Sequence, residues 1–291
     1  MNLLRSLLYV PGSNPRALGK LPALGADGAI LDLEDSVAPD AKAQARSHIL
    51  TSLQKIPPEQ MVRTVRINAI DTPLWQKDVE GVLPGKPDAI VLSKVDGIEA
   101  IEQLTAHLAT LETQVGHPHP TPIWAMIESP RGVQNAPAIA DHPRTACLVM
   151  GTSDLTSALR LKPGINRAPL HFALQQTILA ARAADIPVVD GVFVDLKNPE
   201  GFAAQCREGA TLGFDGKSVI HPSQVEPANL AFQPTPEEID KARRVLESWQ
   251  AAQARGEEIC LMDGELLERL HARQAARILG LDTAFLDGSR K

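Results

Sequence analysis

The stretch Pro122-Ile-Trp-Ala-Met-Ile-Glu-Ser-Pro-Arg-Gly132 gives the first indication of the fold. Residues 123–127 form an unbroken apolar run of strand length. Ser129-Pro130 then has the pattern of a helix N-cap followed by a favoured first helical residue. Glu128 is therefore expected where a buried strand ends and a helix is about to begin.

A second segment has the same arrangement. The apolar run 146–150 is followed by Gly151-Thr-Ser-Asp154 and then by more helix-like sequence. Two carboxylates at the same ends of neighbouring buried strands suggest a site for a hard metal ion. The alternative is that Glu128 and Asp154 only cap the helices that follow them.

Strand-like and helix-like segments alternate along most of the chain. The strand-like runs are residues 6–10, 28–32, 63–67, 89–92, 123–127, 146–150, 186–189 and 211–214, the last open to extension to 220. The helix-like segments are residues 14–24, 40–53, 72–83, 98–111, 132–139, 169–184 and 199–208. Continuous apolar runs, each followed by a helix, are what a closed parallel sheet buried on both faces requires.

The predicted fold class is therefore α/β, a (β/α)₈ TIM barrel with a C-terminal helical appendage. We expect the barrel over residues 1–230 and the appendage over 231–291, with helices near 235–255 and 265–279. A doubly wound sheet is the alternative, but the chain lacks the Gly-x-Gly-x-x-Gly turn of dinucleotide-binding folds and a Walker A sequence.

The composition of the chain excludes several classes of partner. Its net charge is -6, from Lys+Arg 29 against Asp+Glu 35, and no basic run suits nucleic acid or anionic lipid. No apolar stretch approaches the roughly 18 residues of a membrane span. The three cysteines lack Cys-x-x-Cys spacing, as expected for reduced thiols. We therefore expect a cytoplasmic protein that binds neither nucleic acid nor membrane.

Polar residues gather just after the predicted strands, where TIM barrels place their active sites. They are Pro11-Gly12, Asp32, Glu34, Asp35, Arg66, Asn68, Lys94, Glu128, Asp154, Asp190, Lys217 and His221. So many charges at buried strand ends would be costly if they served only packing. They predict a polar, metal-bearing pocket that binds an acid.

Five segments of the chain carry a resemblance to a known family. They are Leu8-Tyr-Val-Pro-Gly12, Leu31-Asp-Leu-Glu-Asp-Ser-Val37, Val65-Arg-Ile-Asn68, Ile127-Glu-Ser-Pro-Arg-Gly132 and Gly213-Phe-Asp-Gly-Lys-Ser-Val-Ile-His-Pro222. In this order they resemble the citrate lyase beta-subunit-like family, a branch of the HpcH/HpaI aldolase superfamily that includes malyl-CoA and citramalyl-CoA lyases. The resemblance implies a magnesium-dependent TIM barrel enzyme. It would make or break a carbon–carbon bond between an acetyl-type thioester and a 2-oxo acid.

The resemblance also implies roles for individual residues. Glu128 and Asp154 match the family's metal ligands, and Mg²⁺ on oxygen ligands keeps positions for the oxygens of a 2-oxo acid. Arg66 matches the family's substrate arginine, both as a binding and as a catalytic residue. Its forked guanidinium suits a carboxylate or the oxygen of a developing thioester enolate. The alternative for Arg66 is a surface ion pair.

The remaining site residues lie in the matching motifs. Asp35, with Asp32 and Glu34, is expected to orient metal-bound water or Arg66, and helix capping is the alternative for Asp35. Lys94 is assigned to anion binding, with structural pairing to the acidic residues as the alternative. Gly12 and Asn68 are assigned to substrate binding.

The C-terminal part departs from the family pattern. Related lyases carry a Gly-x-Met-Ile-Asp-x-Pro motif whose Asp is implied to act as acid/base at a neighbouring subunit. The matching stretch here is Gly264-Glu-Leu-Leu-Glu268-Arg-Leu270. Glu268 is the candidate acid/base, with Asp263 as a second candidate. One extra methylene can displace a proton-transfer contact by over ~1 Å and cost on the order of 100-fold in rate.

The sequence therefore predicts a Mg²⁺-dependent lyase for citryl-, malyl- or citramalyl thioesters of CoA or an acyl carrier protein. The products would be an acetyl-type thioester and a 2-oxo acid such as oxaloacetate. Thioester hydrolysis, aldol chemistry on the same site, and a weakly active structural subunit of a citrate lyase-like complex are the alternatives. A role for Glu268 at a neighbouring subunit requires a homo-oligomer, such as a trimer or hexamer.

Overall fold

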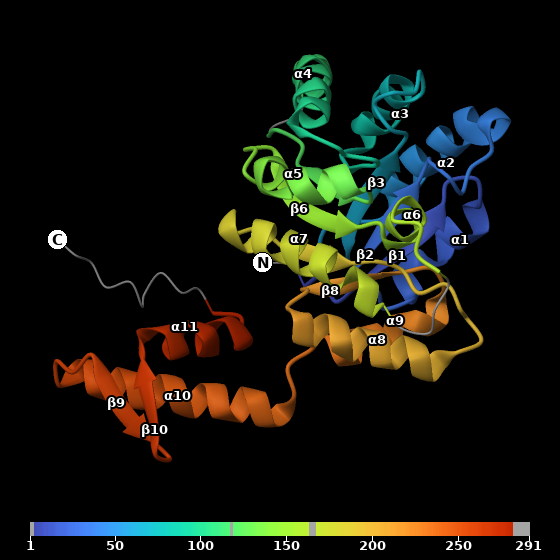
Figure 1. The fold of residues 1–291 in the computed structure, drawn as a ribbon. Helices are drawn as coiled ribbons and strands as arrows, with labels where there is room; N and C mark the ends of the chain where they lie inside the picture. The colour runs from blue at the N-terminus through green and yellow to red at the C-terminus, as the bar shows by residue number, and fades with distance from the viewer. Residues whose placement is uncertain (1–2, 117–118, 163–166, 282–291) are drawn as a thin grey trace. The chain divides into compact units, whose positions relative to one another are not determined.

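The computed structural model describes residues 3–116, 119–162 and 167–281, in which strands and helices alternate (Figure 1). The barrel strands are β1 (Ser6–Pro11), β2 (Gly28–Asp32), β3 (Val62–Ile67), β4 (Ala89–Leu92), β5 (Ile123–Ile127), β6 (Thr145–Met150), β7 (Val188–Asp190) and β8 (Gly216–Val219). The helices are α1 (Pro15–Lys20), α2 (Lys42–Lys55), α3 (Trp75–Val82), α4 (Ile98–Val115), α5 (Pro130–Ala140), α6 (Thr152–Ala158), α7 (His171–Ala183), α8 (Pro199–Leu212) and α9 (Val225–Ala231).

In the described part of the chain, eight parallel strands form a closed barrel in sequence order. Each strand pairs in parallel with the next, and β1 closes the ring by pairing with β8, where Ser6 lies opposite Lys217. The predicted TIM barrel is therefore confirmed. Because all strands run the same way, their carboxyl ends meet at one end of the barrel.

Two apolar clusters explain why the strands are continuous apolar runs. One fills the barrel interior and contains Leu7, Ile30, Val91, Trp124 and Val149. The other lies between the strands and the surrounding helices and contains residues such as Leu31, Ile90 and Leu148. Neighbouring residues of one strand thus enter different clusters, and both faces of the sheet are buried.

The eighth strand lies within the extension to residue 220 that the sequence left open, and not over residues 211–214. Residues 211–212 still belong to α8, which ends at Gly213 in a left-handed conformation (φ 104), the usual helix C-cap of a glycine. The strand itself is Gly216–Val219, and it carries the fully buried Lys217. Because Lys217 is charged, this segment is not an unbroken apolar run, and the hydrophobic pattern did not identify it as a buried strand.

The chain divides into two compact units, one ending at Phe232 and the other starting at Gln233. The second unit contains α10 (Pro236–Ala254), β9 (Ile259–Met262), β10 (Glu265–Glu268) and α11 (Arg269–Ile278). Its own core joins residues of α10 and α11, such as Trp249 and Ala276, to Met262 and Leu267 of the two strands.

The predicted second helix of this unit, 265–279, was wrong in its first turn. Residues Glu265–Glu268 form a strand that pairs antiparallel with β9. Asp263 and Gly264 connect the strands, both with positive φ (53 and 84), as the tight turns of hairpins require. The Asp-Gly pair was the hairpin signal in the sequence.

None of the helices in the described residues combines the length and apolar character needed to cross a membrane.

Candidate active site

A cavity of about 280 Å³ lies at the carboxyl ends of the barrel strands. Its polar lining includes Asp32, Arg66, Glu128 and Asp154, which follow or end four different strands. Its apolar lining includes Met126, Met150, Val192 and Ile220. One wall of the cavity can therefore bind charged oxygen atoms, while the other excludes water.

Arg66 is held in one orientation by two acidic residues. Its Nε and Nη2 donate to the two oxygens of Asp32, at 2.7 and 2.6 Å, and its Nη1 lies 2.7 Å from Oε2 of Glu34. A guanidinium has five N–H groups, so one on each terminal nitrogen is left without a partner among the described residues. Arg66 can therefore bind an anion in the cavity while it remains fixed by the protein.

The Asp32 carboxylate is surrounded by donors. Besides Arg66 it accepts hydrogen bonds from the backbone N–H of Glu34 and from the N–H and hydroxyl of Ser36. Burial alone would raise the pKa of Asp32, but the hydrogen bonds and charge of Arg66 outweigh it and lower this pKa. Asp32 therefore stays ionised and keeps Arg66 charged.

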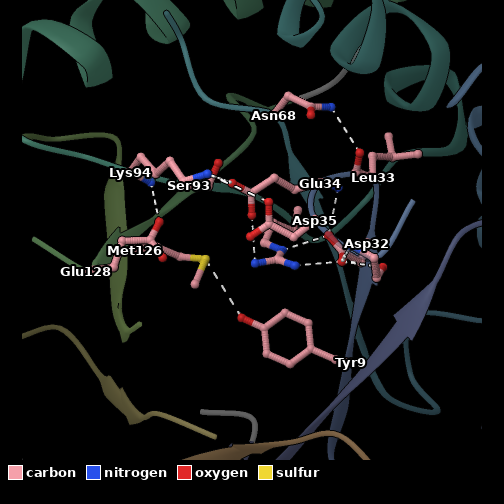
Figure 2. A network of polar contacts seen from close by, with 12 residues as sticks. Tyr9, Asp32, Leu33, Glu34, Asp35, Asn68, Ser93, Lys94, Met126 and Glu128 are labelled. Atoms are coloured by element: carbon pink, nitrogen blue, oxygen red, sulfur yellow. Dashed lines mark hydrogen bonds and ion pairs between the residues drawn. The ribbon is translucent and has the colours of Figure 1, made fainter. Parts of the chain in front are cut away.

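Glu34 and Lys94 extend this network toward Glu128, as Figure 2 shows. Nζ of Lys94 lies 3.0 Å from Oε1 of Glu34 and 3.7 Å from Oδ1 of Asp35. The backbone N–H of Lys94 donates to Oε1 of Glu128. Lys94 has a left-handed backbone (φ 53), which is unusual outside glycine and is often found at functional sites.

Asp35 and Lys94 do not line the cavity with their side chains. The Asp35 side chain is 60% exposed and the Lys94 side chain 48% exposed. They form an ion pair at the rim of the acidic cluster, and Asp35 makes no contact with Arg66. Of the three acidic residues that were expected to orient metal-bound water or Arg66, Asp32 and Glu34 contact Arg66.

Glu128 is buried at the end of β5, close to the turn after β6. A Cβ added at Gly151 would lie 2.5 Å from Oε2 of Glu128 and closer still to its Cβ, so the turn needs glycine. Burial, together with the charges of Glu34 and Asp154, raises the pKa of Glu128 to about 8. The cavity thus has negative charge that Arg66, already paired with Asp32, does not balance.

These residues fit a magnesium ion. Glu128 and Asp154 offer carboxylate oxygens only, and no group of three or more His, Cys, Asp or Glu forms a metal cluster among the described residues. Mg²⁺ commonly uses one or two carboxylates and keeps waters or substrate oxygens for its other positions. Its charge would balance the excess around Glu128.

Two predicted substrate residues have other contacts. Asn68 is buried, donates to the carbonyl of Leu33 and to Asp78, and accepts from Lys42. Gly12 packs closely against β2, where its N–H donates to the carbonyl of Asp32 at 2.8 Å. Neither lines the cavity. Both therefore support the loops that carry Asp32 and Glu34.

The polar residues at the end of β7 and in β8, Asp190 and Lys217, form a separate buried cluster. Asp190 accepts from Nζ of Lys217 at 2.9 Å and from Nη1 of Arg167 at 2.6 Å. Lys217 also donates to the carbonyl of Gly191. His221 accepts from the backbone N–H of Ser223 and thereby caps a short turn. These contacts fix the loops of the barrel, and none of these side chains lines the cavity.

Glu268 belongs to the C-terminal unit, where it is exposed and precedes α11. Its side chain accepts from the backbone N–H of His271, and its own N–H donates to Nδ1 of His271 at 3.0 Å. Asp263, the second candidate, accepts from Nη1 of Arg244 at 2.7 Å. In this unit both carboxylates therefore have local structural contacts.

The sequence reasoning missed Tyr9. It is the only tyrosine of the chain, and its ring lies 5.0 Å from Cζ of Arg66. Figure 2 shows its hydroxyl directed at Met126, whose sulfur lies 3.8 Å away. The signal was its place near the end of the first strand, in the resembling motif. Because its neighbours are apolar, Tyr9 was interpreted as part of the hydrophobic run and not as a site residue.

Comparisons with known proteins show the family of the chain. Residues 5–222 match the family model described as HpcH/HpaI aldolase/citrate lyase. The chain belongs to this family. Its relatives include a (3S)-malyl-CoA thioesterase of Cereibacter sphaeroides, 40% identical over 94% of this chain and 93% of the relative. An L-malyl-CoA/beta-methylmalyl-CoA lyase of the same species is 35% identical over the same shares.

Among solved structures, CitE from Mycobacterium tuberculosis, in complex with magnesium, acetoacetate and coenzyme A, has a TM-score of 0.75 and 28% identity. The match covers 94% of this chain and 96% of that one. The predicted membership in the HpcH/HpaI family and the predicted class of enzyme, a carbon–carbon lyase of citrate lyase beta-subunit type, are thereby confirmed.

Proposed function

We propose that this HpcH/HpaI family member is a Mg²⁺-dependent lyase for a 3-hydroxyacyl-CoA thioester of the malyl type. It cleaves the bond between the carbinol carbon and the carbon next to the thioester. A 2-oxo acid and an acetyl-type thioester are released. The observation that supports it most is that Arg66, with two free N–H groups, lines one cavity with two carboxylates suited to Mg²⁺.

Each group has a defined task in this reaction. Glu128 and Asp154 would hold Mg²⁺, which would supply Lewis-acid chemistry to the reaction. As the proposed acid/base, Glu268, takes the hydroxyl proton and the carbon–carbon bond breaks, the bonding electrons move to the thioester, whose oxygen becomes negative. Arg66 stabilises that negative charge, and the proton held by the acid/base is then returned to the carbon of the enolate.

The charges of the cavity favour an acyl group with a single carboxylate. Among the described residues that line it, Arg66 is the one cation, against three carboxylates. With Mg²⁺ bound these charges sum to zero, so each substrate carboxylate adds negative charge that no lining residue balances. A second, as in citryl thioesters, would meet the apolar side near Met150 and Ile220, where an unpaired charge is costly. Malyl or citramalyl thioesters therefore fit better than citryl thioesters.

Hydrolysis of the thioester is the second candidate. It is favoured by the 40% identical malyl-CoA thioesterase and by Glu268 in place of the family's Asp. In hydrolysis, water attacks the thioester carbon and the CoA thiolate leaves, while the hydroxy acid stays intact. The thioester oxygen again becomes negative, so the role of Arg66 is the same.

We further propose a cytoplasmic homo-oligomer, a trimer or hexamer. The reason is that the family resemblance implies that Glu268 acts as acid/base at the active site of a neighbouring chain. A reducing compartment suits the cysteines, which are free thiols in the described residues. The carrier of the thioester is proposed to be CoA, and an acyl carrier protein is the alternative.

A panel of thioesters tests the function. Purified protein with Mg²⁺ is incubated with malyl-, citramalyl- and citryl-CoA, and the products are identified. Glyoxylate or pyruvate together with acetyl-CoA means lyase, and free CoA with the intact hydroxy acid means hydrolase. Oxaloacetate from citryl-CoA as the main product would contradict the charge argument. No turnover of any thioester would favour the structural subunit.

The metal requirement is tested on the same preparation. We expect EDTA to abolish turnover and Mg²⁺ to restore it. Glu128→Gln and Asp154→Asn should weaken Mg²⁺ binding measured by calorimetry. Unchanged affinity in both variants would remove the proposed metal site, whatever the reaction.

A further inference from the structure

Tyr9 contributes to the cavity wall from β1, next to Arg66. Its ring packs against the apolar cluster inside the barrel and lies 5.0 Å from Cζ of Arg66, within the range of a cation–π contact. Its side chain lines the same cavity as Glu128 and Asp154. Tyr9 and Arg66 therefore face the same ligand volume from neighbouring positions.

The hydroxyl of Tyr9 has a weak partner. Among the described residues its hydrogen bond goes to Sδ of Met126 at 3.8 Å, and a thioether is a poor acceptor. A tyrosine hydroxyl in a largely buried position normally finds a good partner. The donor capacity of Tyr9 is thus largely unused in the protein itself, although both Tyr9 and its partner Met126 line the cavity.

The hydroxyl also keeps its proton. Burial raises the pKa of Tyr9, and although the charge of Arg66 acts in the opposite direction, the pKa remains above its ordinary value. At neutral pH Tyr9 is therefore a neutral donor, and its ionisation does not compete with the pairing of Arg66 and Asp32.

We propose that the Tyr9 hydroxyl donates a hydrogen bond to the thioester oxygen that becomes negative during the reaction, beside the free N–H groups of Arg66. The inference rests on the proposed function, and it holds for carbon–carbon cleavage and for hydrolysis because both place negative charge on that oxygen. Two donors from different strands would then stabilise one oxyanion.

Two structural roles would give the same contacts. The ring could act only as support for the guanidinium of Arg66, or the hydroxyl could act only through its contact with Met126. Tyr9→Phe keeps the ring and removes the hydroxyl, whereas Met126→Leu keeps the hydroxyl and removes its sulfur partner. The two variants therefore separate the three roles.

The experiment measures kcat and KM of the full chain with Mg²⁺ on the thioester that the wild type turns over. For Tyr9→Phe we expect kcat to fall about 10- to 100-fold with KM within about 3-fold, because the donor acts on charge that develops in the transition state. Met126→Leu changes the apolar wall of the cavity but keeps the hydroxyl, so kcat should fall less than in Tyr9→Phe. Thr110→Val removes a hydroxyl on the exposed side of α4 and should match the wild type.

Three results would overturn the inference. If Tyr9→Phe keeps kcat within about 2-fold of the wild type, the ring is the only contribution. If Met126→Leu loses as much as Tyr9→Phe, the hydroxyl acts through its contact with Met126. If the wild type turns over none of the three thioesters, the proposed function fails and the inference fails with it. Melting temperatures of all variants show whether a loss reflects unfolding.

Discussion

Arg66 is the residue whose environment explains most of the site. Burying a guanidinium is costly unless its partners are well aligned, and here Asp32 binds it through two parallel hydrogen bonds. Burial would lower the pKa of Arg66, but the hydrogen bonds and charge of Asp32 outweigh it and raise this pKa. The charge is therefore permanent, and its direction is fixed before a substrate arrives.

The fork of Arg66 leads to the first prediction. Arg66→Lys keeps the charge but cannot bind Asp32 and Glu34 while also presenting N–H groups to the cavity. We expect kcat/KM to fall by about 100-fold or more, on the order of 3 kcal/mol in the barrier.

The matched control is Arg207→Lys, on the exposed side of α8, which should leave kcat/KM unchanged. Near-normal turnover in Arg66→Lys would place this residue outside the reacting centre.

The ends of the strands could be predicted from the sequence because they follow from hydrophobic periodicity. The partners of individual side chains could not be predicted. The position of Glu128 after β5 and that of Arg66 in β3 could be predicted, and both line one cavity. Asn68, by contrast, belongs to a buried hydrogen-bond network with Lys42 and Asp78. This network depends on how α2, α3 and β3 pack together, and no local sequence pattern predicts that packing.

At the scale of elements, the turn between β6 and α6 sets the position of Glu128. Gly151 has an ordinary backbone conformation (φ -98), so its need for glycine is steric. Gly151→Ala should displace the Glu128 carboxylate, weaken Mg²⁺ binding at least about 10-fold and lower turnover accordingly.

Gly19→Ala is the control for this prediction, because a Cβ at Gly19 in α1 would meet nothing within 4 Å. It should leave activity unchanged and stabilise the protein by up to about 1 kcal/mol. Wild-type Mg²⁺ affinity in Gly151→Ala, measured by calorimetry, would show that the turn does not constrain Glu128.

The ion cluster between β7 and β8 provides a prediction about stability. Asp190 is the common partner of Lys217 and Arg167, and the side chains of Asp190 and Lys217 are fully buried. Asp190→Asn keeps the shape but leaves the buried Lys217 without a carboxylate and Arg167 with Glu208 as its remaining one. The free energy of unfolding of the barrel should fall by about 3–5 kcal/mol.

Urea denaturation measures this change. Glu80→Gln, which removes an exposed carboxylate 3.9 Å from His107, should change the free energy of unfolding by less than about 1 kcal/mol. An equally small effect of Asp190→Asn would mean that hydration or relaxation of the cluster compensates for the lost charge.

At the scale of the whole molecule, the sequence predicted the barrel better than the C-terminal unit. The pattern of a strand followed by a helix recurs along the barrel, so the uncertain position of β8 did not change the predicted fold. The C-terminal unit has no such repetition, and there the helical periodicity of residues 265–279 obscured the Asp-Gly turn. Consequently Glu268, the first acid/base candidate of this unit, is found before α11 rather than within a helix.

Glu268 requires a variant that separates its structural contact from its chemistry. Glu268→Gln keeps an oxygen that can accept from the N–H of His271, so α11 should remain capped, but it cannot carry a proton as an acid or base. If Glu268 is the acid/base, Glu268→Gln should lose turnover at an unchanged melting temperature.

Mixed oligomers then show which chain Glu268 serves. Homo-oligomers of Glu128→Gln and of Glu268→Gln should each be inactive. If Glu268 acts at the barrel of another chain, mixing both variants through unfolding and refolding should restore activity, because some sites then combine an intact Glu128 with an intact Glu268. If it acts at its own barrel, no mixture can restore it, since each chain lacks one of the two groups. Full activity of Glu268→Gln alone would exclude Glu268 and make Asp263, which pairs with Arg244, the next residue to replace.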